Sequence, residues 1–443
     1  MIVQTLNSWR RWVEPWYVAY ALLGATSAGL IPILLPVVVS RTGRATDVGL
    51  VMATISLGGV TAPLWGGLAD RYRLHRGLLA GGLFTVTLGL AVFPFTAIPM
   101  ARLGLALLTS IGICGTDREE ISGGRALTPA GQLDLVIGHE MLGQVVEVGQ
   151  SVTRVQRGDY CVLTVRRGCG QCLPCAMNRS DMCRTGNYDE RGIWGLDGYQ
   201  TEYVVDKEHY AVRVPSELGH VGVLTEPLSV AEKAIDEAVH LQLARLPDAS
   251  ATPNWLFDRR CLVAGLGPIG LLAAIALRLR GAQVYGLDIV DADTARPEWL
   301  TVIGGHYVDA RQVPPDKVDD ALGPMELILE ATGVAGLVFN LLDALAPNGV
   351  YVLTGIPSGN RPIEIPGAEL VRQLVLDNQA MVGSVNAARD HFQLAVDDLG
   401  LAQLHWGDHV AKLITHRHPY TDLTALSQHP TDEIKSVVEW TIV

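Results

Sequence analysis

The chain has 443 residues, of which 49% are hydrophobic, and a formal net charge of −12 at pH 7. This length allows two or three domains, each with its own core, and the acidic balance argues against nucleic acid as a partner. The charge is uneven, because residues 1–100 hold seven Arg, no Lys and three acids, net +4, which leaves −16 for residues 101–443. We therefore expect the two parts to have different surroundings.

Three uncharged apolar runs occupy most of the first hundred residues. They are Tyr17–Val39, Val48–Leu68 and Gly77–Met100, of 23, 21 and 24 residues. About 20 apolar residues are enough to cross the hydrocarbon core as a helix. Arg residues lie before the first run and between the second and third, which predicts a cytoplasmic N-terminus and second loop. We predict about three transmembrane helices within residues 1–105 and a membrane location, with the remaining chain cytoplasmic.

The loop from Gly66 to Arg76, which contains Asp70-Arg71, is similar to the loop between the second and third helices of major facilitator superfamily transporters. The alternative is an ordinary positively charged cytoplasmic turn. The fold that this resemblance implies needs many more spans than three. We therefore expect an incomplete transporter-like segment without a transport path.

Two groups of potential metal ligands follow. Cys114, His139 and Glu140 offer a thiolate, an imidazole and a carboxylate, a set that suits a catalytic zinc with one coordination position open for substrate. An all-thiolate shell, typical of a structural zinc site, is offered by Cys169, Cys172, Cys175 and Cys183. The alternative is a disulfide framework, but in a large chain without a secretory signal we expect zinc and a reducing compartment.

A dinucleotide-binding motif lies between two predicted strands, 260–264 and 283–288. The turn that joins the first strand to a helix reaching about residue 280 contains the expected cofactor-binding residues Gly265, Gly267, Pro268, Ile269 and Gly270. Its glycines allow a tight turn and let the pyrophosphate approach the helix N-terminus. Asp288 ends the second strand, where a carboxylate accepts hydrogen bonds from the ribose hydroxyls. No cation follows within three residues to hold a 2′-phosphate, so we predict that NAD is preferred, with NADP possible.

Further alternation of apolar segments predicts a doubly wound α/β fold. Residues 325–332, 349–356 and 380–385 have the pattern of buried strands, with helical segments at 334–345 and 388–399. We assign residues 106–240 to a mostly β catalytic domain with a zinc lobe and residues 241–390 to a Rossmann dinucleotide-binding domain. Residues 391–443 are expected to return to the catalytic domain.

The pattern Gly138-His139-Glu140-x2-Gly143-x5-Gly149-x2-Val152 resembles the signature of zinc-containing medium-chain dehydrogenases/reductases. The branch that the chain resembles most is the glucose 1-dehydrogenases, and the similarity extends over residues 111–443. It is carried by three further segments, Arg166–Gly170, Thr225–Leu228 and Gly383–Asn386.

This resemblance implies a role for four more residues. Thr116 would relay the proton of the substrate hydroxyl, and Glu226 would approach the zinc directly or through water. Glu190, Thr116, Glu226 and Asn386 would form the set that contacts the sugar, with Asn386 also near the nicotinamide. For Asn386 the alternative is an ordinary loop residue.

The function that we expect is zinc-dependent transfer of a hydride from C1 of an aldose to the nicotinamide cofactor, which gives the lactone. Val165 and Val230 stand where the branch usually has Asn and Asp, which favours a less polar sugar or polyol. The resemblance also implies a homo-oligomer formed through the dehydrogenase part.

The junction before Cys114 leaves alternatives open. Family members carry several dozen residues there, whereas here only about residues 102–113 could form a strand. Three spans from a cytoplasmic N-terminus would also place the enzyme on the far side of the membrane, where NAD is scarce. The chain is therefore a membrane-tethered dehydrogenase, a transporter fragment with an inactive dehydrogenase part, or a recombined fusion.

Overall fold

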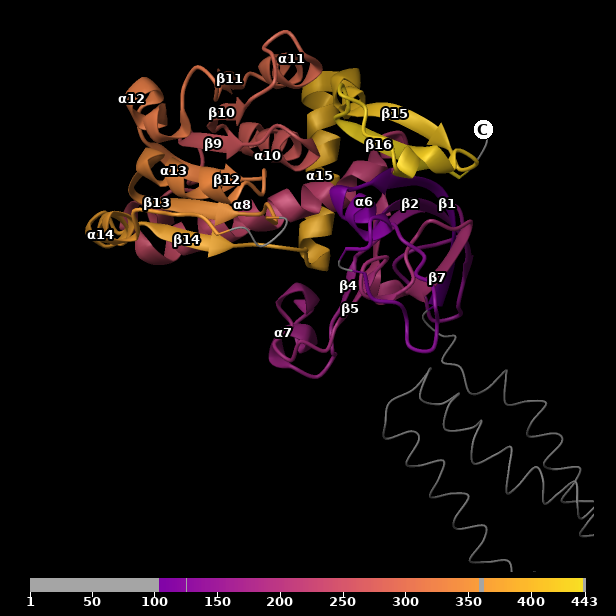
Figure 1. The fold of residues 1–443 in the computed structure, drawn as a ribbon. Helices are drawn as coiled ribbons and strands as arrows, with labels where there is room; N and C mark the ends of the chain where they lie inside the picture. The colour runs from indigo at the N-terminus through magenta and orange to yellow at the C-terminus, as the bar shows by residue number, and fades with distance from the viewer. Residues whose placement is uncertain (1–102, 125, 358–361, 441–443) are drawn as a thin grey trace, which may run out of the picture. The chain divides into compact units, whose positions relative to one another are not determined.

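The computed structural model describes residues 103–124, 126–357 and 362–440 (Figure 1). All of them belong to the second of two compact units, which begins at Arg102. The three apolar runs and the transporter-like loop predicted from the sequence lie outside these residues. Within the described ranges, no helix combines the length and the apolar character needed to cross a bilayer.

A seven-stranded sheet has the order β15-β16-β1-β2-β3-β8, and β7 also pairs with β1. The strands are β1 (Leu103–Ile113), β2 (Glu140–Val148), β3 (Tyr160–Leu163), β7 (Tyr203–Lys207), β8 (Ala211–Val214), β15 (Ile414–Pro419) and β16 (Lys435–Glu439). Ala106, Leu108 and Ser110 are buried and alternate with half-buried residues, the two-residue period of a strand with one face on a core. β1 is antiparallel to β2, β7 and β16, so the segment next to Cys114 is held from both edges.

A smaller lobe extends from this sheet. Its elements are β4 (Arg166–Arg167), α7 (Leu173–Ala176), η3 (Ser180–Met182), β5 (Asp189–Arg191) and β6 (Gly195–Leu196), and its three strands pair in the order β4-β5-β6. The turn after β5 packs closely on the segment before His139. A Cβ on Gly192, whose φ is +72°, would lie 2.3 Å from the carbonyl oxygen of Gly138. This contact holds the turn between the parallel strands β5 and β6 beside the predicted metal ligands.

A six-stranded parallel sheet follows, in the order β11-β10-β9-β12-β13-β14. Its strands are β9 (Arg260–Ala264), β10 (Gln283–Asp288), β11 (His306–Asp309), β12 (Met325–Glu330), β13 (Leu345–Leu353) and β14 (Ala380–Gly383). β9 and β10 coincide with the two strands predicted around the glycine-rich turn. The order reverses at β9 and β12, as in a doubly wound sheet, so the predicted Rossmann-type α/β fold is confirmed.

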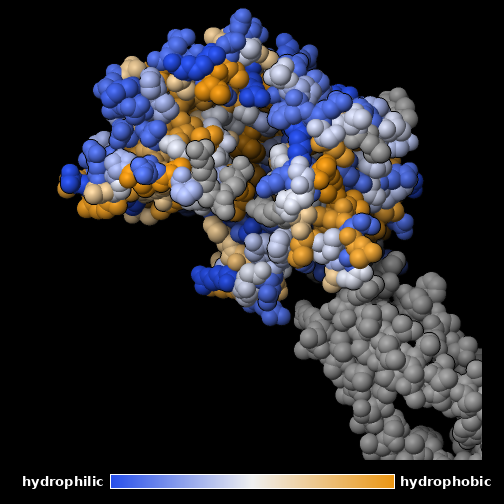
Figure 2. Space-filling view, in the orientation of Figure 1, coloured by the Kyte–Doolittle hydropathy of each residue, from blue (hydrophilic) through white to orange (hydrophobic). Residues whose placement is uncertain are grey.

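The helices of the described chain lie mainly around this parallel sheet. They are α6 (Gly115–Ile121), α8 (Thr225–Arg245), α9 (Pro247–Ala251), α10 (Pro268–Leu279), α11 (Ala295–Val302), α12 (Val318–Leu322), α13 (Ala335–Asn340), α14 (Gly367–Leu376) and α15 (Arg389–Trp406). Figure 2 shows mostly hydrophilic residues over α11 and α12, whereas hydrophobic residues gather over α14. Val371, Val375 and Leu376 of α14 are 60%, 69% and 69% exposed.

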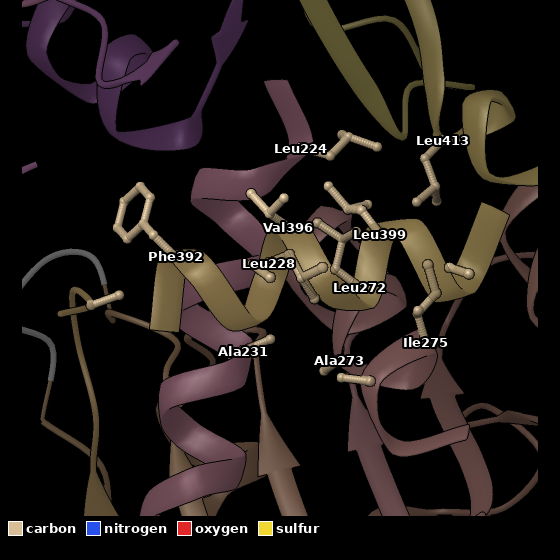
Figure 3. Close-up of a cluster of buried hydrophobic side chains, with 14 of the residues drawn as sticks. Leu224, Leu228, Ala231, Leu272, Ala273, Ile275, Phe392, Val396, Leu399 and Leu413 are labelled. Atoms are coloured by element: carbon tan, nitrogen blue, oxygen red, sulfur yellow. The ribbon is translucent and has the colours of Figure 1, made fainter. Parts of the chain in front are cut away.

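The core between the two large sheets is built by α8, α10 and α15. Leu228 of α8, Leu272 of α10 and Phe392 of α15 are fully buried and converge in one cluster (Figure 3). Each such side chain stabilises the fold by roughly 1.5–3 kcal/mol relative to an exposed one. Arg280 adds ion pairs at 2.7 Å to Glu232 and 2.6 Å to Asp398, which join the same helices. The N-terminus of α8, which carries Glu226, is therefore held rigidly.

Candidate active site and metal centres

Pairing of β1 with β2 brings the first group of predicted metal ligands together. Cys114 follows β1 directly, His139 precedes β2, and Glu140 is the first residue of β2, opposite Gly112. One donor atom from each of the three ligands lies within 4.8 Å of the others. Gly112 is required here, because a Cβ would lie 2.0 Å from Oε2 of Glu140. Thiolate, imidazole and carboxylate at this spacing fit a zinc ion.

Asp117 is a further residue of this site, and no role was predicted for it from the sequence. Its buried carboxylate accepts hydrogen bonds from the backbone N–H of Cys114 at 2.7 Å and of Gly138 at 3.2 Å, and lies 3.3 Å from Nδ1 of His139. Burial opposes both charges, yet His139 holds the pKa of Asp117 below its ordinary value, and Asp117 with Cys114 raises that of His139. The one available signal was its position three residues after Cys114, at N3 of α6, where an acidic side chain caps a helix.

Lys435 is a second residue that the sequence did not indicate. Its ammonium is buried on β16, 2.5 Å from Oε1 of Glu140 and 3.0 Å from the carbonyl oxygen of Ile113. Although burial alone would lower it, the pKa of Lys435 is raised by the carboxylate of Glu140. Glu140 is thus close enough to Cys114 and His139 to bind a metal with them, and it also forms an ion pair with Lys435. Since 295 residues separate Lys435 from Glu140, no local pattern could reveal the pair.

Thr116 and Glu226 lie at the edges of this group. Thr116 is half-buried on the first turn of α6, with its Oγ1 3.9 Å from the sulfur of Cys114. Glu226 is buried at the start of α8 but does not belong to the group of donor atoms within 4.8 Å. Burial raises the pKa of Glu226 to about 7, with Glu140 adding to the rise and His139 opposing it. Glu226 therefore takes up or releases a proton near neutral pH.

The four lobe cysteines form the second cluster. Their sulfur atoms lie within 4.8 Å of one another, all four are free thiols, and the disulfide alternative is not seen. Hydrogen bonds from Thr185 and from backbone N–H groups lower the pKa of Cys169 to about 6, so its sulfur is a thiolate at neutral pH. Burial and the neighbouring thiols raise the pKa of Cys175 to about 12. A cation among the sulfurs would relieve this, and four such donors fit a structural zinc.

The glycine-rich turn has the shape that a pyrophosphate needs. A Cβ on Gly270 would lie 1.8 Å from the carbonyl oxygen of Gly265, whose own φ is +91°, so both positions require glycine. Gly267 is the N-cap of α10, and a Cβ there would meet no atom within 4 Å. Pro268 and Ile269 open the helix and are partly exposed. Free backbone N–H groups at an open helix N-terminus fit a bound phosphate.

Asp288 stands beside this turn, where the ribose of a dinucleotide would lie. Its two carboxylate oxygens accept the backbone N–H of Leu266 and of Ile289, each at 2.7 Å. Two cations that lie further along the chain than the three residues after Asp288 are close to this region. Arg296 lies 3.8 Å from Asp288, and Arg311 pairs with Asp309 at 2.7 Å and with Asp291 at 2.8 Å.

The predicted sugar-binding residues Glu190 and Asn386 contact each other. The side-chain amide of Asn386 donates to Oε1 of Glu190, and Arg166 donates to the same oxygen at 2.9 and 3.0 Å. All three residues are buried. The amide oxygen of Asn386, Oδ1, accepts no hydrogen bond from the described residues. Val165, assigned to substrate discrimination from the sequence, is 2% exposed within the hydrophobic core.

Comparison with known proteins agrees with this architecture. Residues 107–216 match the family model of the alcohol dehydrogenase GroES-like domain, and residues 219–440 match that of the glucose dehydrogenase C-terminus. Glucose 1-dehydrogenase 2 of Vulcanisaeta moutnovskia is 39% identical over 77% of this chain and 93% of its own length. Glucose 1-dehydrogenase of Methanocella arvoryzae is 34% identical over 76% of this chain and 91% of its own.

Solved structures give the same result. The glucose dehydrogenase of Haloferax mediterranei, in complex with NADP, Zn and gluconolactone, is 33% identical, with a TM-score of 0.69 over 77% of this chain and 93% of that one. The fold and the two groups of ligands define a zinc-dependent medium-chain dehydrogenase that uses a nicotinamide cofactor. Within that class, the chain belongs to the glucose 1-dehydrogenase family.

Proposed function

We propose that the protein oxidises an aldose at C1, transferring the hydride to the nicotinamide cofactor and releasing the lactone. The observation that carries the proposal is the buried pair of Glu190 and Asn386, which Arg166 of β4 holds. Glu190 lies on β5, and the turn after this strand packs against Gly138, next to His139. A carboxylate and an amide recognise sugar hydroxyls by hydrogen bonds. The relatives named glucose 1-dehydrogenases and the Haloferax complex with gluconolactone support it.

The residues of the chain have separate tasks in this reaction. Zinc held by Cys114 and His139, with Glu140 beside them, would supply a Lewis acid that acidifies the C1 hydroxyl. Oγ1 of Thr116 would relay that proton, giving up its own as it receives one. The buried Oδ1 of Asn386, which no described residue satisfies, can accept a hydrogen bond from a sugar hydroxyl or from the nicotinamide amide. Glu226, with a pKa of about 7, can take up a proton at neutral pH. The C–H electrons leave as hydride to the cofactor, so that the balance needs no further oxidant.

We expect the preferred cofactor to be NAD. The carboxylate of Asp288 keeps lone pairs for the ribose hydroxyls, whereas a 2′-phosphate at this point would be repelled by it. Arg311 is an exposed candidate for a phosphate ligand, but Asp309 and Asp291 already hold its guanidinium. The cofactor of the Haloferax relative is NADP, so the two enzymes would differ at this position.

A substrate panel tests the reaction. The purified full chain, loaded with zinc, is supplied with NAD and with aldoses, polyols or simple alcohols, and formation of NADH and of lactone is followed. Turnover of aldoses with lactone as product is expected, with less polar deoxy sugars among the substrates. Thr116→Val should abolish most of the turnover and Thr116→Ser should retain it. Activity confined to simple alcohols would overturn the sugar assignment.

For the N-terminal part, we propose that the apolar runs between residues 17 and 100 attach the enzyme to a membrane. The dehydrogenase part lies in the cytoplasm if only two of the three runs cross the bilayer from a cytoplasmic N-terminus. Their length and lack of charge support this. Membrane fractionation, followed by carbonate extraction and protease protection of inverted and intact vesicles, tests both attachment and sidedness. Recovery in the soluble fraction would contradict the attachment.

We further propose a homo-oligomer formed through the dehydrogenase part. β14 lies at the end of the parallel sheet, and the neighbouring α14 exposes Val371, Val375 and Leu376, an apolar surface of the kind that a second copy covers. Sedimentation of the full chain in detergent gives the oligomeric state. Val375→Glu should shift it toward monomer, whereas Leu404→Glu, at an even more exposed position on α15 (84% against 69%), should not.

A further inference from the structure

Lys233 is a buried cation to which the mechanism above gives no role. Its side chain on α8 is 2% exposed, and its Nζ lies 3.0 Å from Oδ2 of Asp181 and donates to the carbonyl oxygen of Val385 at 2.9 Å. Glu237, one helical turn further on, lies 3.8 Å away. A buried ammonium is tolerated only where such partners replace its water. Lys233 therefore holds a side chain and a backbone segment that are remote from each other in sequence.

The first partner belongs to the four-cysteine lobe. Asp181 lies in η3, between Cys175 and Cys183, and its side chain is fully buried. Its backbone carbonyl accepts a hydrogen bond from Nη1 of Arg166 at 2.8 Å. The contact between Lys233 and Asp181 thus continues through the lobe to Arg166.

The second partner of Lys233, Val385, is also connected to Arg166, through Asn386 and Glu190. Arg166 donates to Glu190, and so does Asn386, the residue directly after Val385. Asn386 has φ 64°, a left-handed conformation that a non-glycine residue keeps only where its surroundings hold it. The contacts form a closed ring that runs from Lys233 through Asp181, Arg166, Glu190 and Asn386 back to Lys233.

We propose that Lys233 is a positioning residue for substrate recognition, which orients the Glu190–Asn386 pair and couples the four-cysteine lobe to it. The inference rests on the proposed function for the identity of the ligand at this pair. Stability alone does not require the ammonium, because a buried ion pair can often be replaced by apolar side chains without loss. One atom of the ring, the buried Oδ1 of Asn386, accepts no hydrogen bond from any described residue and is available to a ligand.

Kinetics of Lys233→Met, which keeps the length of the side chain and removes its charge, test the proposal. We expect KM for the sugar to rise about tenfold, with KM for NAD changed less than about twofold and two zinc ions per chain retained. Asp181→Asn, a milder change in the same contact, should raise KM for the sugar in the same direction if Lys233→Met folds poorly. Lys317→Met is the matched control, since the Lys317 side chain is 60% exposed and its ammonium lies 3.6 Å from the exposed Asp320.

A double-mutant cycle separates positioning from general support of the fold. If Lys233 acts through Asn386, then Lys233→Met should add little to the sugar KM of Asn386→Ala. Full additivity of the two effects, or an unchanged sugar KM in both Lys233→Met and Asp181→Asn, would overturn the proposal.

Hydrogen exchange of the amides of residues 384–388 provides a readout that does not depend on the substrate. These amides should exchange faster in Lys233→Met than in wild type, with amides of β9 and β10 unchanged. An unchanged exchange rate at residues 384–388 would rule out the positioning role of Lys233, even if the enzyme oxidises aldoses. Faster exchange in an enzyme that oxidises no aldose would instead reject the proposed function and keep the role of Lys233.

Discussion

The carboxylate of Asp117 lies 3.3 Å from Nδ1 of His139 and also accepts the backbone N–H groups of Cys114 and Gly138. One buried side chain therefore joins the segment after β1 to the segment before β2, the two segments that carry the metal ligands. A carboxylate this close to Nδ1 favours the tautomer that carries its proton on Nδ1 and leaves Nε2 for the metal.

Asp117→Asn should weaken zinc binding at Cys114 and His139 by about 10- to 100-fold, the usual effect of losing a carboxylate behind a ligand His. Zinc in the lobe should be unaffected, so that a competing chelator removes one zinc early and the other late. Glu119→Gln, an exposed change on the same helix, is the control. Identical chelator curves for the two variants would show that Asp117 does not orient His139.

Gly168→Ala should damage the four-cysteine lobe. A Cβ at this position would lie 2.4 Å from the sulfur of Cys175, and overpacking of this kind costs about 1–3 kcal/mol. We expect weaker zinc binding in the lobe and a lower Tm. Gly400→Ala on α15 has space, since its nearest neighbour, Cδ1 of Leu218, is 4.0 Å away, and should be neutral or stabilising. Equal effects of the two changes on zinc content would contradict the predicted crowding.

Asp206 should make the fold sensitive to acid. Its buried Oδ2 pairs with Arg167 at 2.6 Å and Arg191 at 3.0 Å. Burial opposes the charge, but Arg167 and Arg191 hold the pKa of Asp206 below its ordinary value of 3.8. Because the folded pKa lies below the unfolded one, the stabilisation is fully present above the unfolded pKa and is lost as pH falls through the folded pKa.

Asp206→Asn should therefore lower the free energy of unfolding by about 3–5 kcal/mol at pH 7, since it leaves the buried Arg167 and the half-buried Arg191 without their carboxylate. The difference from wild type should shrink as the pH is lowered below about 4. Urea unfolding of both proteins between pH 3 and 7 measures it. A difference that does not depend on pH would show that the carboxylate charge is not the cause.

Charge changes beside Asp288 should alter cofactor choice. Asp288→Ser should lower kcat/KM with NAD about tenfold or more, through the loss of charge-assisted hydrogen bonds, and raise it with NADP. Asp291→Asn should release Arg311 toward a phosphate and also raise kcat/KM with NADP. The exposed Asp293→Asn should change neither. A wild-type enzyme that already prefers NADP would refute the expected NAD preference.

Local patterns in the sequence predicted most of the nucleotide-binding fold. β9, β10 and α10 follow from an apolar strand, a glycine turn and a second strand that are adjacent in the chain, and the four lobe cysteines lie within fifteen residues. Such features depend on neighbours that the sequence shows directly. Alternation also placed β12, β13 and β14 to within a few residues, although β13 begins four residues before the predicted strand.

Contacts between distant residues could not be predicted in this way. Glu140 and Lys435 are 295 residues apart, and Glu190 and Asn386 are 196 apart, so only the folded sheets bring them together. Arg311 lies 23 residues beyond Asp288, and its approach depends on the pairing of β10 with β11. Lys435 and Arg311 are charged residues whose carboxylate partners cannot be recognised in the sequence. Their ion pairs are seen only in the folded structure.

The position of β1 has a consequence for the order in which the protein folds. This strand leaves the ribosome before the rest of the dehydrogenase part, yet its partner β16 is made more than 300 residues later, and Ser110 pairs with Glu439. The first sheet therefore cannot close during most of synthesis. β7 covers Leu103–Leu107 of β1 earlier, but Ser110–Ile113 have no partner on that edge until β16 is made. Lys435 lies on β16, so the carboxylate of Glu140 acquires its counter-ion only when β16 pairs with β1.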